Sequence, residues 1–206
     1  MNSLPDRTPT IETQISDAMR VKLRRLKWLL LDVDGVLTDG KITLTDNGEE
    51  MKSFHIADGL GLVALQAQGM KVGFVTGRQS PIVQRRAKEL GVALVLEKVR
   101  DKGVALQQIA REQSTSLDEI GFVGDDWNDL PAFALCGFRF APRNAAKLVR
   151  DEADYVCSHE GGNGAVREIC ELILEASGTL RTTALTDYLA SLRDSGKIGE
   201  SESTGQ

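Results

Sequence analysis

The stretch "LLLDVDGVLTDG", residues 29–40, decides the fold because an apolar run stops there at two aspartates. Three consecutive leucines are typical of a buried strand. Asp32 and Asp34 follow two residues apart, and in an extended strand their side chains would project to the same face. Two like charges at this spacing repel each other unless a positive charge offsets them. The stretch therefore predicts a strand that ends at a charged site.

Apolar runs and helical patterns alternate along the rest of the chain. Strands are predicted at 28–33, 71–76, 92–96, 119–124, 137–141 and 154–157. Helices are predicted at 58–68, 81–90, 102–113, 128–135, 144–151 and 163–176. Short apolar strands separated by helices of this length indicate an α/β protein with a Rossmann-like, doubly wound parallel sheet. Ligands of such sheets bind at the carboxyl ends of the strands.

One segment, residues 41–54, breaks this alternation. Asn47-Gly48 lies between β-rich flanks and is a strong signal for a tight hairpin turn. Ile42 and Leu44 alternate regularly, whereas Met51 and Phe54 are three residues apart. We expect a β-hairpin inserted after the first strand, with a bulge or a short second strand.

Composition excludes several classes of protein. A chain of 206 residues is long enough for one domain with its own core. It carries 25 basic and 30 acidic residues, a net charge of -5, which argues against a general nucleic-acid binder. No apolar segment approaches the roughly 20 residues of a membrane span, and no signal-peptide core is present. We therefore expect a cytoplasmic protein that binds neither membrane nor nucleic acid.

Cysteine and histidine usage limits the choice of metal ligands. Cys136, Cys157 and Cys170 are odd in number and lack C-x-x-C spacing, which favours buried thiols in a reducing compartment. His55 and His159 are far apart in sequence, so a histidine-rich metal site is not expected. Any metal would have to be held by oxygen.

Four loops converge on the predicted edge of the sheet. They carry Asp32 and Asp34; Thr76, Gly77 and Arg78; Lys102; and Asp125, Asp126 and Asp129. Five carboxylates at one edge would repel each other strongly unless a hard divalent cation lay among them. Oxygen ligands with positions open to water and phosphate suit Mg²⁺.

This set of residues suits phosphoryl transfer. Asp32 could attack phosphorus and form an aspartyl phosphate, while Asp34 protonates the leaving alcohol and later activates water. Thr76, the Gly77 amide and Lys102 could donate to the charged phosphoryl oxygens.

Each motif has a structural explanation when taken alone. D-x-D-G occurs in ordinary turns, Lys102 by itself suits a surface helix, and "GDDWND" could be a helix N-terminus with favourable acidic residues. The order of the motifs and their shared position at strand ends favour the functional interpretation.

The four motifs "DVDGVLTDG", "TGR", Lys102 and "GDDWNDLP" resemble those of the haloacid dehalogenase superfamily, in order and over about half of the chain. More narrowly, "DNGEEMKSFHIADGLG", "TGRQSPIVQRRAKELG" and "GGNGAVREIC" resemble the 3-deoxy-D-manno-octulosonate 8-phosphate phosphatases. The resemblance implies a capless phosphatase that releases the eight-carbon sugar acid (KDO) for lipopolysaccharide synthesis. It also implies a homotetramer in which hairpins associate at the centre and a C-terminal tail reaches a neighbouring site.

The resemblance also implies a role for each site residue. Asp32 becomes the nucleophile and Asp34 the general acid/base. Mg²⁺ takes the carboxylates of Asp32 and Asp125 and the backbone carbonyl of Asp34. Phosphate is bound by Thr76, Gly77 and Lys102, with Asp126 and Asp129 orienting waters or Lys102 from behind. Arg78 is the candidate for the substrate carboxylate, with a structural ion pair as the alternative.

Three further side chains receive structural interpretations. We expect Lys52 to be an exposed edge lysine that discourages aggregation, although it could meet a neighbour's substrate. We expect Asp58 to cap a helix at 59–68, and Arg167-Glu168 to serve structure at the start of the last helix.

The resemblance divides the chain into three parts: a lead-in at 1–26, a phosphatase domain at 27–178 with its hairpin flap at about 41–54, and a partly disordered tail at 179–206. Residues 1–19 are expected to be frayed, and the basic run 20–27 to form a solvated helix face. A weak helical pattern spans 184–192, and 200–206 are expected to be disordered.

The sequence departs from the family pattern in three places. Glu97-Lys98 replaces the usual Gln-Gly before the motif lysine, and "PRN" adds Arg143 near the site. The C-terminal tail is longer than the short form found in the family and lacks a lysine after its glycine. These differences argue against closure of the tail over a neighbouring site.

Three other functions fit part of the pattern. A phosphorelay receiver also clusters aspartates, but its acceptor ends the third strand, where this chain has "LEK". A non-catalytic assembly domain would not need Asp32, Asp34, Lys102 and Asp125 together. A phosphatase of a nine-carbon 2-keto-3-deoxy sugar acid phosphate would keep the chemistry and change the substrate.

Overall fold

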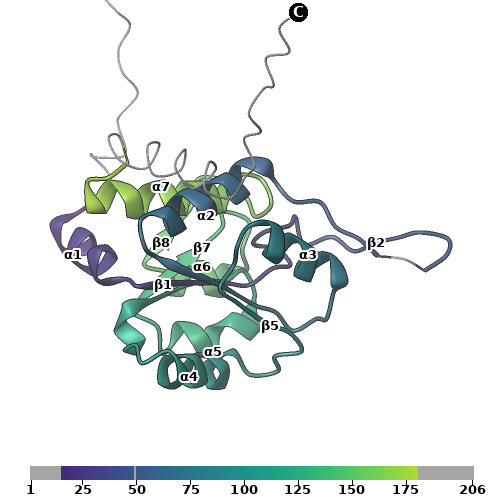
Figure 1. Ribbon diagram of the computed structural model, residues 1–206, viewed down its shortest axis with the longest axis horizontal. Helices are drawn as coiled ribbons and strands as arrows, with labels where there is room; N and C mark the ends of the chain where they lie inside the picture. Colours follow the sequence, from purple (N-terminus) through teal and green to yellow (C-terminus); the bar gives the residue numbers. More distant parts are fainter. Residues whose placement is uncertain (1–14, 49, 181–206) are drawn as a thin grey trace, which may run out of the picture.

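The computed structural model describes residues 15–48 and 50–180. Within these residues six parallel strands form a sheet in the order β5-β4-β1-β6-β7-β8 (Figure 1). The strands are β1 (Trp28–Leu31), β4 (Lys71–Val75), β5 (Leu94–Leu96), β6 (Ile120–Val123), β7 (Phe138–Ala141) and β8 (Tyr155–Val156). The chain winds outward from β1 to β5, then crosses to β6 on the other side of β1. The predicted doubly wound parallel sheet is confirmed.

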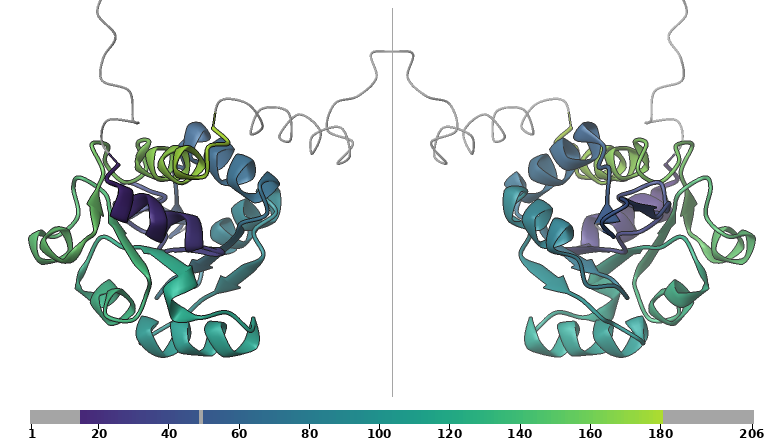
Figure 2. Two further views of the ribbon diagram at one scale, coloured as in Figure 1. Left: turned by 90° about the vertical axis from the view of Figure 1, so that its left-hand side faces the viewer. Right: turned by 90° about the vertical axis from the view of Figure 1, so that its right-hand side faces the viewer.

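Helices cover both faces of this sheet (Figures 1 and 2). One apolar core lies under α1 (Asp17–Arg25), α2 (Ile56–Ala67), α3 (Pro81–Glu89) and α7 (Ala165–Ser177). A second core lies under α4 (Lys102–Glu112), α5 (Leu130–Phe133) and α6 (Lys147–Glu152). The short 3₁₀ turns η2 (Leu117–Glu119) and η3 (Trp127–Asp129) precede β6 and α5. Strands buried from both sides account for their continuous apolar sequences.

Strand register places the predicted motifs at one edge. Leu31 pairs with Phe74 of β4 and with Val123 of β6. The chain segments that follow these three strands therefore leave the sheet at nearly the same level. Strand β1 is also where the winding direction reverses, which is where doubly wound sheets bind ligands.

The inserted hairpin is present, and its second strand is short. Strands β2 (Thr43–Leu44) and β3 (Glu50–Met51) pair antiparallel and extend away from the body of the molecule (Figure 1). Because Leu44 pairs with Glu50, the connection between the two strands is longer than the two-residue turn that Asn47-Gly48 signals. Gly48 does adopt a positive φ of 77°.

Helix α1 corrects the prediction for the N-terminal region. The frayed lead-in predicted for residues 1–19 is wrong where it overlaps this helix, which starts at Asp17 with Ser16 as its N-cap. Leu23 and Leu26 are buried in the core under α7. Arg20 and Arg24 donate to backbone carbonyls at the end of α7, at 3.2 and 2.5 Å. Tertiary packing, rather than local sequence preference, holds this helix.

Some predictions fall outside the described residues. They are the structure of residues 1–14, the helical pattern at 184–192, the disorder at 200–206 and the closure of the tail over a neighbouring site. The division of the chain at residues 27 and 178 stays a prediction.

Asp58 caps a different helix from the one predicted. Helix α2 already includes Asp58, and its N-cap is His55. The buried Asp58 carboxylate instead accepts hydrogen bonds from the backbone N–H groups of Gly164 and Arg167, at 3.3 and 2.8 Å. Asp58 thereby satisfies the first amides of α7, whose own N-cap, Gly164, has no side chain.

We predict that Leu23→Ala lowers the free energy of unfolding by about 2–4 kcal/mol, because it leaves a cavity between α1 and α7. Val21→Ala on the exposed side of the same helix should change it by less than about 0.5 kcal/mol. Urea denaturation of both variants measures the difference. Equal effects would show that α1 does not pack on the domain in solution.

Candidate active site

A buried lysine joins two of the predicted carboxylates. Lys102 opens α4, and its Nζ lies 3.0 Å from Asp32 Oδ1 and 2.5 Å from Asp129 Oδ1. Burial by itself would lower the pKa of Lys102, but Asp32 and Asp129 outweigh it and raise that pKa. The ammonium is therefore a fixed positive charge at the end of β1.

Asp129 holds this lysine in place from within the core. Its side chain is fully buried, and its second oxygen accepts from the backbone N–H groups of Asp125 and Asp126, at 2.9 and 3.1 Å. Both oxygens of Asp129 thus have protein partners. The position agrees with the predicted task of orienting Lys102, which stays a prediction.

The Asp125 carboxylate has one buried oxygen that is not hydrogen-bonded. This oxygen, Oδ1, has no partner among the described residues. Burial, together with the negative charges of Asp32 and Asp129, raises the pKa of Asp125 to about 8. Burial likewise raises the pKa of Asp32, against the opposing effect of Lys102. The positive charge of Lys102 is therefore too small to balance the carboxylates at this edge.

A divalent cation fits that need. Asp32, Asp125 and Asp129 each offer an oxygen, and these atoms lie within 4.8 Å of one another. Because Asp129 is occupied by Lys102 and two amides, the oxygens of Asp32 and Asp125 are those left for a metal. All are hard oxygen donors, as Mg²⁺ prefers.

Close backbone contacts shape this cation site. Gly35 has φ +97°, and a Cβ there would lie 2.0 Å from Asp125 Oδ2. A Cβ at Gly161 would lie 1.7 Å from the Gly35 carbonyl oxygen, and the Gly162 N–H donates to Val36 at 2.9 Å. Larger residues would push the "DVDG" loop away from Asp125.

A second group of charges surrounds Asp34. Lys52 Nζ forms an ion pair with Asp34 and lies 3.4 Å from Glu50 Oε1. Arg78 Nη2 lies 2.6 Å from Glu50 Oε1, and Arg78 Nε lies 3.9 Å from Asp34 Oδ2. The ion pair that was the alternative for Arg78 is thus present. The structure does not bring Asp34 or Arg78 into the hydrogen bonds around Lys102.

Lys52 corrects a prediction and is the residue that the sequence interpretation missed. It is not an exposed edge lysine, because only 2% of its side chain is accessible. The signal was available: Glu50 and Lys52 are two residues apart beside a strand, a spacing that turns both side chains to one face. What the sequence could not show was which element that face meets.

The remaining predicted residues lie around these two groups. Thr76 is buried at the end of β4, and its Oγ1 accepts from the Arg78 N–H at 3.2 Å. Gly77 follows on the surface. Asp126 is exposed, and its carboxylate accepts from the Trp127 N–H at 2.8 Å, where it caps η3. The phosphate and water contacts predicted for these residues stay predictions.

Two of the sequence departures acquire structural partners. Glu97 Oε1 accepts from the Ser80 N–H at 2.8 Å, at the start of α3, and Lys98 adopts φ 57°. Arg143 Nη2 lies 2.7 Å from Glu160 Oε1 on the surface. The side chains of Glu97 and Arg143 therefore have contacts within the protein that need no substrate.

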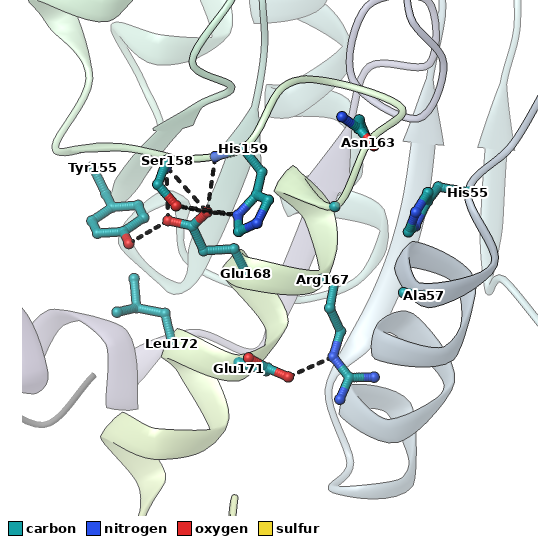
Figure 3. A pocket seen from close by; sticks show the side chains of 11 residues that line it. His55, Ala57, Tyr155, Ser158, His159, Asn163, Arg167, Glu168, Glu171 and Leu172 are labelled. Atoms are coloured by element: carbon teal, nitrogen blue, oxygen red, sulfur yellow. Dashed lines mark hydrogen bonds and ion pairs between the residues drawn. The ribbon is translucent and has the colours of Figure 1, made fainter. Parts of the chain in front are cut away.

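A separate hollow of about 570 Å³ lies beside the start of α7 (Figure 3). Glu168 organises its wall by accepting from Tyr155 at 2.7 Å, from Ser158 and from the His159 ring at 2.6 Å. This agrees with a structural role for Glu168. None of the predicted site residues lines this hollow.

Comparisons with known proteins agree with this geometry. A sequence profile of haloacid dehalogenase-like hydrolases matches residues 92–169. The chain is 41% identical over 160 residues to the 3-deoxy-D-manno-octulosonate 8-phosphate phosphatase KdsC of Haemophilus influenzae, covering 78% of this chain and 89% of the relative. It is 36% identical over 166 residues to KdsC of Escherichia coli, covering 81% and 88%.

Solved structures show the same fold. The phosphatase of Moraxella catarrhalis, in complex with a magnesium ion, a phosphate ion and a KDO molecule, has a TM-score of 0.80 and 39% identity, over 82% of this chain and 98% of that one. The cobalt-bound phosphatase of Haemophilus influenzae has a TM-score of 0.76 and 39% identity, over 82% and 99%.

The doubly wound sheet and its strand-end carboxylates define a haloacid dehalogenase-like hydrolase. Within that class, the chain belongs to the family of 3-deoxy-D-manno-octulosonate 8-phosphate phosphatases.

We predict that Asp125→Asn stabilises the metal-free protein at alkaline pH. The folded-state pKa of Asp125, about 8, exceeds its ordinary 3.8. Its contribution to stability is fully present below about pH 4 and is lost as the pH rises toward about 8. Asparagine does not titrate. In EDTA, the unfolding free energy of the variant minus that of wild type should increase from about pH 5 to about pH 9 in urea denaturation.

Excess Mg²⁺ should raise the melting temperature of the wild type and leave that of Asp125→Asn unchanged, because the variant lacks a charged ligand. An equal rise in both proteins would exclude Asp125 as a metal ligand.

Proposed function

We propose that this chain is a Mg²⁺-dependent phosphatase that hydrolyses 3-deoxy-D-manno-octulosonate 8-phosphate to KDO and inorganic phosphate, through an aspartyl phosphate on Asp32. The observation that carries the proposal is the buried Asp32–Lys102–Asp129 array beside Asp125, whose Oδ1 has no partner among the described residues. Relatives at 36–41% identity carry this activity in their names, and one solved relative holds magnesium, phosphate and KDO.

Asp32 attacks phosphorus on the side opposite the leaving sugar oxygen. Lys102 contacts one oxygen of Asp32, which orients the carboxylate and leaves its other oxygen for the attack. The same ammonium lies where charge builds on the phosphoryl oxygens, and Thr76 and the Gly77 amide add donors from the end of β4. Asp129 keeps Lys102 in place during the transfer.

Asp34 acts as the general acid and base. It lies outside the Lys102 array, and about a quarter of its side chain is accessible, so a substrate oxygen can reach it. In the first step its carboxyl protonates the departing sugar oxygen, and in the second it accepts a proton from the water that attacks the aspartyl phosphate.

The carboxylates of Asp32 and Asp125 and the backbone carbonyl of Asp34 would hold Mg²⁺. Bound there, the ion supplies positive charge that keeps both carboxylates ionised and offsets the charge of the phosphoryl group. Asp126 would orient coordinated water from the edge of this site.

Arg78 would recognise the carboxylate of the sugar acid. Its guanidinium is about half exposed at the mouth of the site, and its fork suits bidentate pairing. Glu50 engages one of its nitrogens and holds the group near Asp34.

The hairpin supports assembly into a homotetramer. Ile42, Leu44 and Met51 are 59%, 64% and 57% exposed, so an apolar hairpin surface faces solvent in the single chain. Association of hairpins around a common centre would bury these side chains.

In the part of the chain that the structure describes, no helix could cross a membrane. We place the reaction in the cytoplasm.

The described site offers no observation that favours one of the three other functions. Strand β5 of this sheet ends at Leu96 and is followed by Glu97, so it offers no aspartate for a phosphorelay receiver. A non-catalytic assembly domain has no need for a buried Lys102 between two carboxylates. The nine-carbon substrate differs only in the sugar and is tested directly.

We predict that Asp32→Asn lowers kcat by about a thousandfold or more, because no aspartyl phosphate can form. Phosphate release is measured with the eight-carbon and nine-carbon sugar acid phosphates, and kcat/KM should favour the eight-carbon ester. Circular dichroism controls for folding. Turnover near the wild-type rate would refute the mechanism, and a preference for the nine-carbon ester would refute the substrate.

We predict that Leu44→Asp dissociates the tetramer, because it places a charge in the apolar hairpin surface. Native mass spectrometry or light scattering gives the subunit number. Val21→Asp, on the similarly exposed Val21 of α1, is the matched control and should leave the assembly intact. A wild-type protein that runs as a monomer would refute the tetramer.

A further inference from the structure

Lys52 is buried although it lies in an exposed hairpin. Its side chain is 2% accessible, whereas Lys41, at the other end of the same hairpin, is 80% accessible. An ammonium group that leaves water loses hydration and needs close negative partners. Lys52 has two, Asp34 and, at 3.4 Å, Glu50.

Strand geometry aims this lysine at the site. Side chains along an extended segment alternate between two faces. Glu50 and Lys52 therefore share the face that meets Asp34 and Arg78, while Met51 between them faces solvent. The hairpin thus presents its charges inward, to the site of its own chain, and its apolar side chains outward.

Asp34 depends on the hairpin for its closest cation. Its carboxylate emerges after β1 in the "DVDG" loop, while the Lys102 array holds Asp32 and Asp129. Among the described residues, the cations next to Asp34 are Lys52, in direct contact, and Arg78 at 3.9 Å. Arg78 in turn is bound to Glu50 of the hairpin.

We propose that Lys52 is a positioning residue, which holds the Asp34 carboxyl group in the orientation that faces the leaving-group oxygen. The proposal rests on the proposed function, because it assigns Lys52 to the step in which Asp34 protonates the departing alcohol. A carboxyl group free to rotate would spend little time in line with that oxygen. Lys52 and Glu50 would thereby give the hairpin a catalytic task within one chain.

The test compares leaving groups. An alkyl oxygen needs a proton to depart, whereas p-nitrophenolate departs without one. The kcat/KM value reports the steps through formation of the aspartyl phosphate. Lys52→Met keeps the apolar stem and removes the charge. It should lower kcat/KM about tenfold or more for both 3-deoxy-D-manno-octulosonate 8-phosphate and glycerol 3-phosphate, and much less for p-nitrophenyl phosphate.

Lys41→Met is the matched control on the same hairpin and should leave all three values near those of the wild type. Lys52→Arg, which keeps the charge, should recover much of the loss on the two alkyl esters. If Lys52→Met does not fold, as judged by urea denaturation and subunit number, Lys52→Gln replaces it.

Three outcomes would overturn the proposal. A loss confined to the sugar acid ester, and seen in KM, would make Lys52 a substrate contact. An equal loss on all three esters, without rescue by arginine, would make it a structural residue. Alkyl ester turnover by Lys52→Met equal to that of Lys41→Met would deny it any role. Wild-type activity separates this failure from that of the proposed function. If the wild type hydrolyses none of the esters, the proposed function itself fails; if the wild type is active and one of the three outcomes occurs, only the role of Lys52 fails.

Discussion

Crowding of negative charge at the end of β1 is the constraint on which the rest of the site depends. Asp32, Asp125 and Asp129 offer oxygens within 4.8 Å of one another, and burial makes their repulsion stronger than in water. Lys102 offsets the charge between Asp32 and Asp129 by direct contact, but its effect on Asp125 is outweighed by burial and by the other carboxylates. The raised pKa of Asp125 follows from this imbalance. A site with this deficit is built for a divalent cation and an anionic substrate.

Backbone packing keeps these charges together against their repulsion. The parallel register brings Asp32 and Asp125 out of neighbouring strands at one level, and glycines at 35 and 161 let two loops approach each other closely. Asp58 holds the start of α7, which follows the Gly161 loop, by accepting from the Gly164 and Arg167 N–H groups. Stability and function are therefore coupled here, since the elements that fix the loops also belong to the core under α2 and α7.

The hairpin connects the chemistry with assembly. Its alternating side chains direct Glu50 and Lys52 toward the site and leave Leu44 and Met51 exposed, where we propose that other copies of the chain bind. Two faces of one short element thus carry two proposed functions. The described part of the chain, which has no separate cap domain, can in this way order the side chains around Asp34 by its own hairpin.

Local pattern in the sequence was enough to predict the strands, the doubly wound order and the residues at strand ends, because periodicity and apolar runs report directly on burial. Lys102, Asp32 and Asp129 were assigned to one site on that basis, and they do meet. Three predictions were wrong: the frayed lead-in where it overlaps α1, the cap formed by Asp58 and the environment of Lys52. Each depends on a partner more than a hundred residues away or on another element: α1 on α7, Asp58 on Gly164, Lys52 on Asp34. The sequence by itself determined which residue types stand at the ends of which strands. Only the tertiary structure decided which charges pair, because pairing depends on distances between segments that the order of residues does not specify.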